Sequence, residues 1–337
     1  MKGFKRFAVL GFALCMLSAC GTKQTVGDGS VTAEDNEVVL ELAEMHMAEH
    51  PITKGSIYFG ELVKEKTHGR VTVDVCPASL KGSENAAISK VSNGTLDMAR
   101  VNCVALEGSN PGLKPLTMPY LIESREHLWR VLDSPIGDEM LSGIEGCNGI
   151  AWLDSGSRCF YAKDAIQSPQ DMQGKTFRVP SSKMMTSLME AYGANTVNMD
   201  FSQVYTAIDD GTIDGAENDI ISYSSNAHNV VAKNFVLDNH SFSPSVIIMS
   251  DEAKKKISDE DYELILQCAK EAEAKSRELW IEKENQVMEQ LKGQKTNIIE
   301  LTPEQKAVFI DSSAGIYDLY PEYGDVIEEI KKLGDNQ

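Results

Sequence analysis

Alternating hydrophobic and polar positions predict short strands separated by helices along most of the chain. Valines at every second position mark residues 70–75 as a strand, and residues 38–43 form another. Between them, a helix is predicted to begin at Pro51 and to end before Gly69. The same reasoning predicts strands at 96–101, 149–153 and 176–179 and helices at 83–92, 125–132 and 182–192. Repeated strand–helix–strand units indicate an α/β fold with mainly parallel sheets.

The C-terminal third follows a different pattern. After Ser258, a typical cap, apolar residues keep mostly to helical spacing until Gly293. At ~1.5 Å per residue this helix is about 50 Å long, more than one small domain can cover. We therefore expect it to brace two domains. A further helix is predicted to begin at residues 302–305, where Thr-Pro-Glu-Gln forms a capping box.

Composition and charge narrow the class of protein. With 42% hydrophobic and 25% charged residues, the 337-residue chain is neither collagen-like, nor disordered, nor a multi-span membrane protein. Its 51 acidic residues outnumber the 32 basic ones, which gives a formal net charge of −19. Such a surface repels the phosphate backbone, so nucleic acid is not an expected partner.

The first 19 residues are typical of an export signal, with three basic residues before a short apolar run. This run is far shorter than the ~20 residues of a membrane-spanning helix. The sequence Leu17-Ser18-Ala19-Cys20-Gly21 resembles the lipobox of bacterial lipoproteins. We therefore expect Cys20 to carry a lipid that anchors the protein to a membrane, and residues 20–37 to form a flexible tether. The alternative is an ordinary cleaved signal.

The remaining cysteines do not indicate a metal site or a disulfide framework. Five follow Cys20, an odd number, and none are spaced as Cys-x-x-Cys. Buried free thiols are expected, with a single disulfide as the alternative. There is no phosphate loop, no Ser/His/Asp set and no histidine-rich metal spacing, so no metal or cofactor is predicted.

Arg178 is the first candidate for ligand binding. It lies near the carboxyl end of the strand at 176–179, and alternation places it on the face opposite Phe177 and Val179. In such sheets ligands bind beyond the carboxyl ends of the strands. A guanidinium there can hold a carboxylate through two parallel hydrogen bonds. The alternative is a surface arginine paired with one of the many acids.

Other polar residues follow predicted strand ends. Arg158 would supply a second cation after the strand that ends at Leu153, and Asn218 an amide after a short strand at 212–214. Taken singly, a residue at such a position is more often a turn residue whose hydrogen bonds are satisfied locally. The further candidates are Asp154, Glu84, Arg100, Asn102 and His46. Glu84 and Asp154 could also serve as the paired carboxylates of a secreted hydrolase.

Several segments, in order from about Glu41 to Trp280, resemble the solute-binding proteins of TRAP (tripartite ATP-independent periplasmic) transporters. They are His50-Pro51-Ile52-Thr53-Lys54-Gly55, residues 61–67 and 94–99, Met118-Pro119-Tyr120-Leu121, residues 201–207, and Asp214-Gly215-Ala216-Glu217-Asn218. An ordered match over most of the chain is more specific than any single motif.

The resemblance implies a two-domain fold like that of periplasmic binding proteins, with a ligand cleft at the hinge and a long bracing C-terminal helix. We expect one domain to comprise residues 38–155 and 244–283, and the other residues 156–243 and 284–337. The family's arginine in the Phe177-Arg178-Val179-Pro180 segment binds the ligand carboxylate, so Arg178 is expected to do so here. Arg158 and Asn218 match positions that line the family's pocket.

A narrower likeness concerns the ligand. Residues 98–102, 154–161 and 131–137 are similar to the branch that binds hexuronates such as glucuronate and galacturonate. The family usually has Pro or Asn after Asn218, where this chain has Asp219 and Ile220, so that wall of the pocket departs from the pattern.

The resulting prediction is a monomeric, lipid-anchored, extracytoplasmic binding protein that delivers an acidic sugar to the membrane subunits of a TRAP permease. It is expected to perform no covalent chemistry and to need no cofactor. Three alternatives remain open: a C4-dicarboxylate or other organic acid as ligand, a binding protein that reports to a sensor, and the secreted hydrolase.

Overall fold

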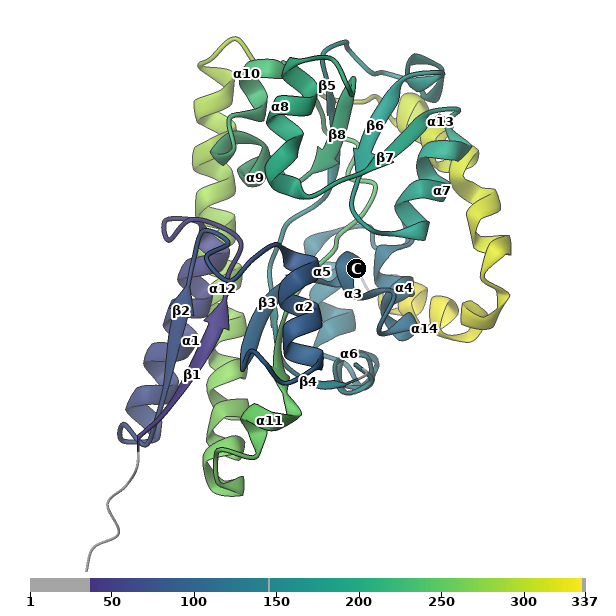
Figure 1. Ribbon diagram of the computed structural model, residues 1–337. Coiled ribbons are helices and arrows are strands. Elements are labelled where there is room, and N and C mark those ends of the chain that lie inside the picture. The colour runs from purple at the N-terminus through teal and green to yellow at the C-terminus, as the bar shows by residue number, and fades with distance from the viewer. Residues whose placement is uncertain (1–36, 145, 335–337) are drawn as a thin grey trace, which may run out of the picture. The chain divides into compact units, whose positions relative to one another are not determined.

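The computed structural model describes residues 37–144 and 146–334, which fold around two sheets (Figure 1). The predicted signal peptide, Cys20 and the tether as far as residue 36 lie outside the described residues. The first sheet has the order β2 (Val71–Cys76), β1 (Val38–Ala43), β3 (Met98–Asn102), β10 (Ser245–Ser250) and β4 (Cys147–Leu153). The second has the order β11 (Asn297–Ile299), β9 (Asn234–Val236), β5 (Cys159–Ala162), β8 (Gly215–Asn218), β6 (Thr176–Val179) and β7 (Asn195–Asn198).

Strand pairing is mostly parallel, as the sequence predicts. Apart from an isolated bridge between Arg158 and Ser241, the antiparallel pairings in the described residues all involve β10 or β5. These are the strands at which the chain passes between the sheets, from β4 to β5 and from β9 back to β10. Neither sheet is therefore built from one continuous stretch of sequence.

Helices cover the sheets and join their strands. In the part associated with the first sheet they are α1 (Pro51–Lys66), α2 (Glu84–Ser92), α3 (Cys103–Leu106), α4 (Lys114–Thr117), α5 (Arg125–Leu132), α6 (Pro135–Ser142) and α11 (Asp251–Lys254). With the second sheet are α7 (Lys183–Ala191), α8 (Val204–Asp209), α9 (Ile220–Ser225) and α10 (His228–Val231), and the C-terminal part adds α12 (Asp259–Lys292), α13 (Pro303–Ser313) and α14 (Gly324–Gly334). Strands alternating with helices confirm the α/β class.

The long helix α12 confirms the predicted brace. Ser258 caps it by accepting a hydrogen bond from the backbone N–H of Asp261 (3.1 Å), and three acidic residues in the first turn favour the positive end of the helix dipole. The helix packs on α1 and β4 of the first sheet, and on α9 and β11 of the second (Figure 1). Trp280, on this helix, is 1% exposed. One helix thus contacts both sheet groups.

One predicted strand was wrong. Residues 212–214, expected to form a strand, have no regular secondary structure, and β8 is Gly215–Asn218 itself. Gly215 fits this central strand because a β-carbon there would lie 2.4 Å from the carbonyl oxygen of Tyr161 and 2.8 Å from the Phe177 ring. The strand is therefore specified by its neighbours in the sheet rather than by its own alternation.

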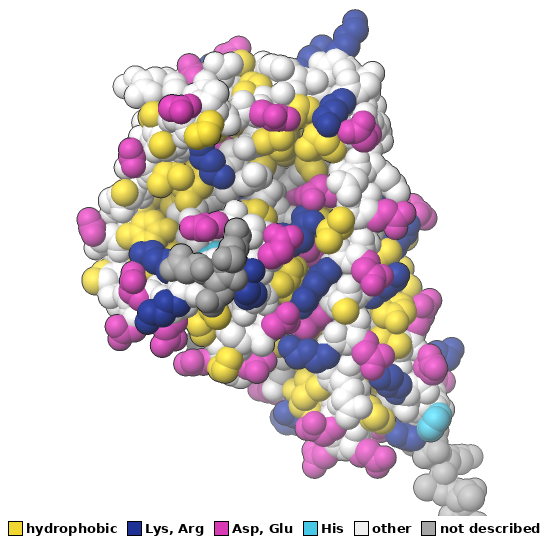
Figure 2. Space-filling model, turned by 180° about the vertical axis from the view of Figure 1, so that it is seen from behind, with side chains coloured by type: hydrophobic (Ala, Val, Ile, Leu, Met, Phe, Trp, Pro, Cys, Tyr) yellow, Lys and Arg dark blue, Asp and Glu magenta, His cyan; other side chains and the backbone are white. Residues whose placement is uncertain are grey.

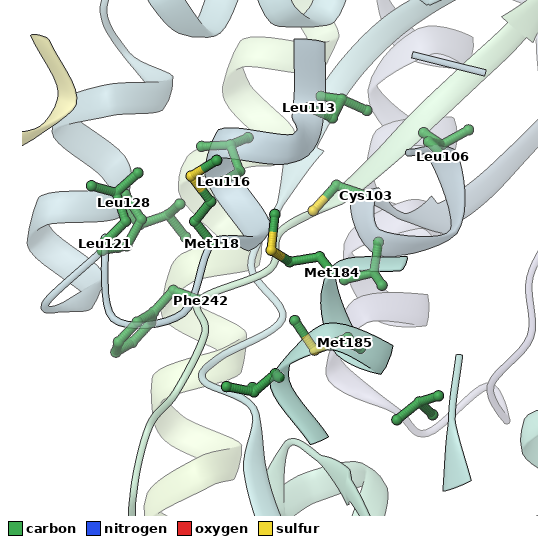
Figure 3. Packing of buried hydrophobic residues seen from close by; sticks show 14 of the residues in the cluster. Cys103, Leu106, Leu113, Leu116, Met118, Leu121, Leu128, Met184, Met185 and Phe242 are labelled. Atoms are coloured by element: carbon green, nitrogen blue, oxygen red, sulfur yellow. The ribbon is translucent and has the colours of Figure 1, made fainter. Parts of the chain in front are cut away.

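The hydrophobic core continues from one sheet group to the other. Figure 3 shows Met184 and Met185 of α7 facing residues that follow β3, including Cys103 of α3. Nearby, Glu107 accepts hydrogen bonds from the hydroxyls of Thr117 (2.7 Å) and Ser182 (2.9 Å), and Ser182 caps α7. Methionine side chains are flexible and adapt to small changes in their surroundings. The packing of Met184 and Met185 can therefore adjust to small movements of α7 against the residues that follow β3.

The C-terminal helix α14 packs on α5. His127 of α5 shares a hydrogen bond of 2.8 Å with the Ile330 carbonyl, and Arg130 Nε donates to the Leu333 carbonyl (2.6 Å). Residues 324–334 therefore contact a helix from the expected first domain, although the sequence had placed them with the second.

The five cysteines in the described residues are free, as expected, and all but the half-buried Cys76 are buried. The acid-rich helix α12 presents a solvated outer face. Figure 2 shows basic and acidic side chains interspersed over the side of the molecule on which it lies. No helix among the described residues combines the length and apolarity that crossing a bilayer requires.

Candidate functional site

The predicted ligand arginine, Arg178, is buried and has no acidic partner. It lies on β6, opposite Ala216 of β8, and is 6% exposed. Its Nε donates a hydrogen bond to the Met199 carbonyl (3.0 Å), and the guanidinium lies 5.6 Å from the centre of the Phe201 ring. Within the described residues it forms no ion pair. A buried cation without a counter-ion is costly, so this position is prepared for an anion.

Arg158, the second predicted cation, is already paired. It lies just before β5, and its Nε and Nη2 bind both carboxylate oxygens of Glu217, with 2.7 Å for the Nη2–Oε1 bond. The Nη2 group also donates to the Glu217 carbonyl (3.2 Å). Both side chains are buried. Arg158 therefore borders the site with its charge neutralised.

The first sheet contributes a second neutralised arginine. Arg100 of β3 binds Glu44 with two hydrogen bonds, of which Nε–Oε2 is 3.0 Å, and Glu44 is fully buried. Glu84, the first residue of α2, lies 3.6 Å from Arg100 Nη1 and accepts a 2.8 Å hydrogen bond from the Asn102 backbone N–H. Glu84 and Arg100 were both predicted to bind the ligand, and the structure places them next to each other on one side of the site.

The side-chain amides of Asn102 and Asn218, both predicted to bind the ligand, differ in how many hydrogen bonds they already make within the protein. Asn102 is engaged at both ends, because its Oδ1 caps α3 through Val104 N (3.0 Å) and its Nδ2 donates to the Ser243 carbonyl (3.1 Å). Asn218 accepts from the Asp219 N–H (3.0 Å), and its Nδ2 makes no hydrogen bond with any described residue. Only Asn218 keeps donors available for a ligand.

Electrostatic coupling joins the residues of the two sheets. Burial lowers the pKa of Arg178, and the carboxylates of Glu217 and Glu84 act in the opposite direction. Burial raises the pKa of Asp219 to about 6, and this residue in turn acts on both Arg100 and Arg158. Glu84 and Arg100 belong to the first sheet group and the others to the second, so the charged cluster spans both.

His46 reaches the same cluster from the loop after β1. Its backbone N–H donates to Glu44 Oε1 (2.9 Å), its ring stacks on His50 at 4.0 Å, and it meets the edge of Phe201 at 6.5 Å. Burial, and then the charge of Arg100, lowers the pKa of His46. A neutral imidazole is thus placed beside the aromatic ring that lies against Arg178.

Asp154 is not brought to the cluster. It is fully buried, and its carboxylate accepts hydrogen bonds from Gly156 N (2.8 Å) and Trp129 Nε1 (3.2 Å) and pairs with Arg125 Nε at 3.2 Å. These contacts fix the segment between β4 and β5. The Asp154 carboxylate is engaged by these partners and makes no contact with Glu84 in the described residues. The hydrolase alternative required these two carboxylates to act as a pair, and the structure does not support that pair.

A cavity of about 440 Å³ borders the charged cluster, because its lining includes Ser157 and Cys159, on either side of Arg158 in the sequence, and Ile220, next to Asp219. Its lining comes from the segments that join the sheets, such as Ser157 and Asn239, and from Glu284 and Met288 of α12. None of the eight predicted ligand residues lines it. We place the candidate site at the charged cluster, because Arg178 forms no ion pair in the described residues, whereas Arg125, the arginine that lines the cavity, pairs with Asp154 and Glu284.

Sequence reasoning missed the acidic partners of the arginines. Glu44 follows directly after the first strand, so the strand-end argument could have selected it. Glu217 lay in a segment that was noted, without a role being assigned. His240 was not among the candidate site residues, and its Nδ1 shares a 2.7 Å hydrogen bond with Asp238. The described residues contain no group of three or more His, Cys, Asp or Glu that could hold a metal ion.

Comparison with known proteins gives consistent matches. The model of the family described as bacterial extracellular solute-binding protein, family 7, matches residues 42–322. A curated solute-binding protein from Chromohalobacter salexigens is 28% identical over 85% of this chain and 87% of its own length.

Two solved structures of TRAP periplasmic solute-binding proteins have the same fold. One, from Xanthobacter autotrophicus with bound β-D-galacturonate, has a TM-score of 0.83 and 32% identity, covering 87% of this chain and 99% of its own. The other, from Pseudomonas putida with bound D-glucuronate, has a TM-score of 0.84 and 28% identity, with 87% and 97% coverage.

Proposed function

Because the chain belongs to bacterial extracellular solute-binding protein family 7, the solute-binding proteins of TRAP transporters, we propose that it binds a hexuronate and delivers it to the membrane subunits of such a transporter. The observation that carries this proposal is Arg178, a buried arginine without an ion pair in the described residues. A sugar carboxylate supplies the missing anion, and the planar guanidinium can bind both of its oxygens.

The remaining groups of the site suit the hydroxyls of a sugar. Asn218 offers amide donors, and Glu84 offers the acceptor Oε2, which makes no hydrogen bond with the described residues. Phe201 supplies an apolar face beside Arg178. This combination of a guanidinium without an ion pair in the described residues, amide donors, a carboxylate acceptor and an aromatic ring fits an acidic sugar.

We also propose that the two sheet groups act as domains that close over the ligand. The boundaries are those expected from the sequence, with residues 324–334 moved to the first domain because α14 packs on α5. The Glu107–Ser182 hydrogen bonds and the core around Met184 would form on closure. Closure excludes water and thereby strengthens the bond between Arg178 and the carboxylate.

Calorimetry tests the ligand assignment. Glucuronate or galacturonate is expected to bind the purified protein. Neutral glucose is expected to bind roughly a hundredfold more weakly or not at all, because it leaves a buried arginine unpaired. Succinate, the dicarboxylate alternative, is expected to bind less tightly than either uronate. Tighter binding of succinate would contradict the hexuronate assignment while leaving the family unaffected.

The lipid anchor is a separate proposal, based on the sequence around Cys20. Cys20→Ser removes the thiol to which a lipid would be attached, so the variant is expected to leave the membrane fraction. Fractionation of cells that express either form, followed by a high-salt wash, is the measurement. If the variant remains with the membranes after the wash, a different anchor holds the protein.

A further inference from the structure

Glu217 is close in the sheet to two arginines but binds only one of them in the described residues. It belongs to β8, the strand between β5 and β6, with Arg158 just before β5 and Arg178 on β6. Electrostatically it acts on both guanidinium groups. By binding Arg158, Glu217 removes that guanidinium as a partner for a ligand anion, whereas Arg178 has no ion pair in the described residues.

His240 completes the surroundings of Glu217. Its buried Nε2 has no hydrogen-bond partner in the described residues and lies 3.4 Å from Glu217 Oε2. On the other side of the ring, Nδ1 bonds to Asp238 Oδ2 (2.7 Å), and the ring stacks on Phe160 at 4.3 Å. The second oxygen of Asp238 accepts the Phe160 backbone N–H (3.0 Å), so the histidine is fixed from behind.

The carboxylates around His240 favour its protonated, positively charged form. Burial by itself would lower the pKa of His240, but the carboxylates of Asp238 and Glu217 outweigh it and raise the pKa to about 9. For Glu217, burial would raise the pKa, yet Arg158 and His240 lower it to about 2. At neutral pH an imidazolium and a guanidinium therefore hold one carboxylate between them.

We propose that His240 holds Glu217 on Arg158, and that this arrangement limits the site to one free cation, so that it selects ligands with one carboxylate over ligands with two. The proposal rests on the proposed function, because it assumes that Arg178 takes the ligand carboxylate.

A second ligand carboxylate would find no partner in the cluster. Arg158 is bound by Glu217 and Arg100 by Glu44, while Glu84 and Asp219 add negative charge. Burying a second anion there leaves it unpaired, which is unfavourable. In this account Glu217 determines specificity, and His240 is a positioning residue.

Glucuronate and glucarate provide the test, because they share a six-carbon skeleton and differ at C1, where glucarate carries a second carboxylate and so cannot form the pyranose ring. The change of the affinity ratio between wild type and variants is the deciding quantity, since the ring difference is the same for every variant. Calorimetry at pH 7.5 is expected to show that the wild-type protein binds glucuronate roughly tenfold or more tightly than glucarate. Glu217→Gln releases Arg158 and is expected to shift the affinity ratio toward glucarate by about tenfold. His240→Asn retains a donor for Asp238 but loses the charge facing Glu217, and its ratio is expected to shift the same way by a smaller factor.

The ratio of two affinities separates specificity from folding, since partial misfolding lowers the active fraction equally for both ligands. His68→Asn, at an exposed histidine, is the matched control and is expected to keep the wild-type ratio. Wild-type binding of glucarate as tight as that of glucuronate would overturn the proposal, as would wild-type ratios in both Glu217→Gln and His240→Asn. If the wild type binds neither acid, the proposed function fails and this proposal fails with it.

Discussion

Arg178→Ala is expected to weaken hexuronate binding by roughly two to four orders of magnitude. Removing one partner of a buried, hydrogen-bonded charge pair costs about 3 to 5 kcal/mol, and about 1.4 kcal/mol corresponds to a tenfold change in affinity. Titration calorimetry with glucuronate measures the effect. Arg178→Lys is not expected to restore binding, because an ammonium group lacks the planar fork that matches a carboxylate.

The same variant should leave the ligand-free protein at least as stable as the wild type. Arg178 has no ion pair in the described residues, so alanine there removes an uncompensated buried charge, and this gain is expected to offset the loss of the hydrogen bond to the Met199 carbonyl and of the contact with Phe201. Urea unfolding without ligand checks this expectation. Full hexuronate binding by Arg178→Ala would rule out the carboxylate role of this residue.

Glu44→Gln is expected to produce the largest loss of stability, on the order of 3 to 5 kcal/mol. Glu44 is fully buried and is held by Arg100 through two hydrogen bonds, so a neutral amide leaves a buried guanidinium without its counter-ion. The free energy of unfolding, obtained from urea denaturation, is the measurement.

An exposed pair serves as the control for this variant. Glu328 and Lys331 are one turn apart on the surface of α14, and Glu328→Gln is expected to leave the unfolding midpoint unchanged. If Glu44→Gln unfolds at the wild-type midpoint, then Glu84, 3.6 Å from Arg100, is a sufficient partner and the Arg100–Glu44 pair is not essential.

Elements with strong local signals could be predicted from the sequence almost to the residue. α1 and α12 begin after recognisable caps and follow a helical period, and β1 is a continuous run of strand-forming residues. The strand β8 was misplaced because its short, glycine-initiated sequence gives no alternation. β5 and β10 were not predicted, since their identity depends on antiparallel partners distant in the chain.

The sequence could predict where the arginines of the candidate site lie, but not which acidic residue each of them pairs with. The argument from strand ends selected Arg178, Arg158 and Arg100, and the structure brings all three to one charged cluster. Which arginine stays free depends on Glu44 and Glu217, which lie 56 and 59 positions from their partners. Local patterns carry no information about contacts at that separation.

The position of β10 between β3 and β4 has a consequence for the order of folding. A chain ending before residue 245 has both neighbours of β10 but leaves the strand position between them empty. The first sheet therefore cannot close while the chain emerges from the ribosome until residue 250 has been made. Contacts between such distant segments form slowly. Most of the chain is therefore made before the first sheet can be completed.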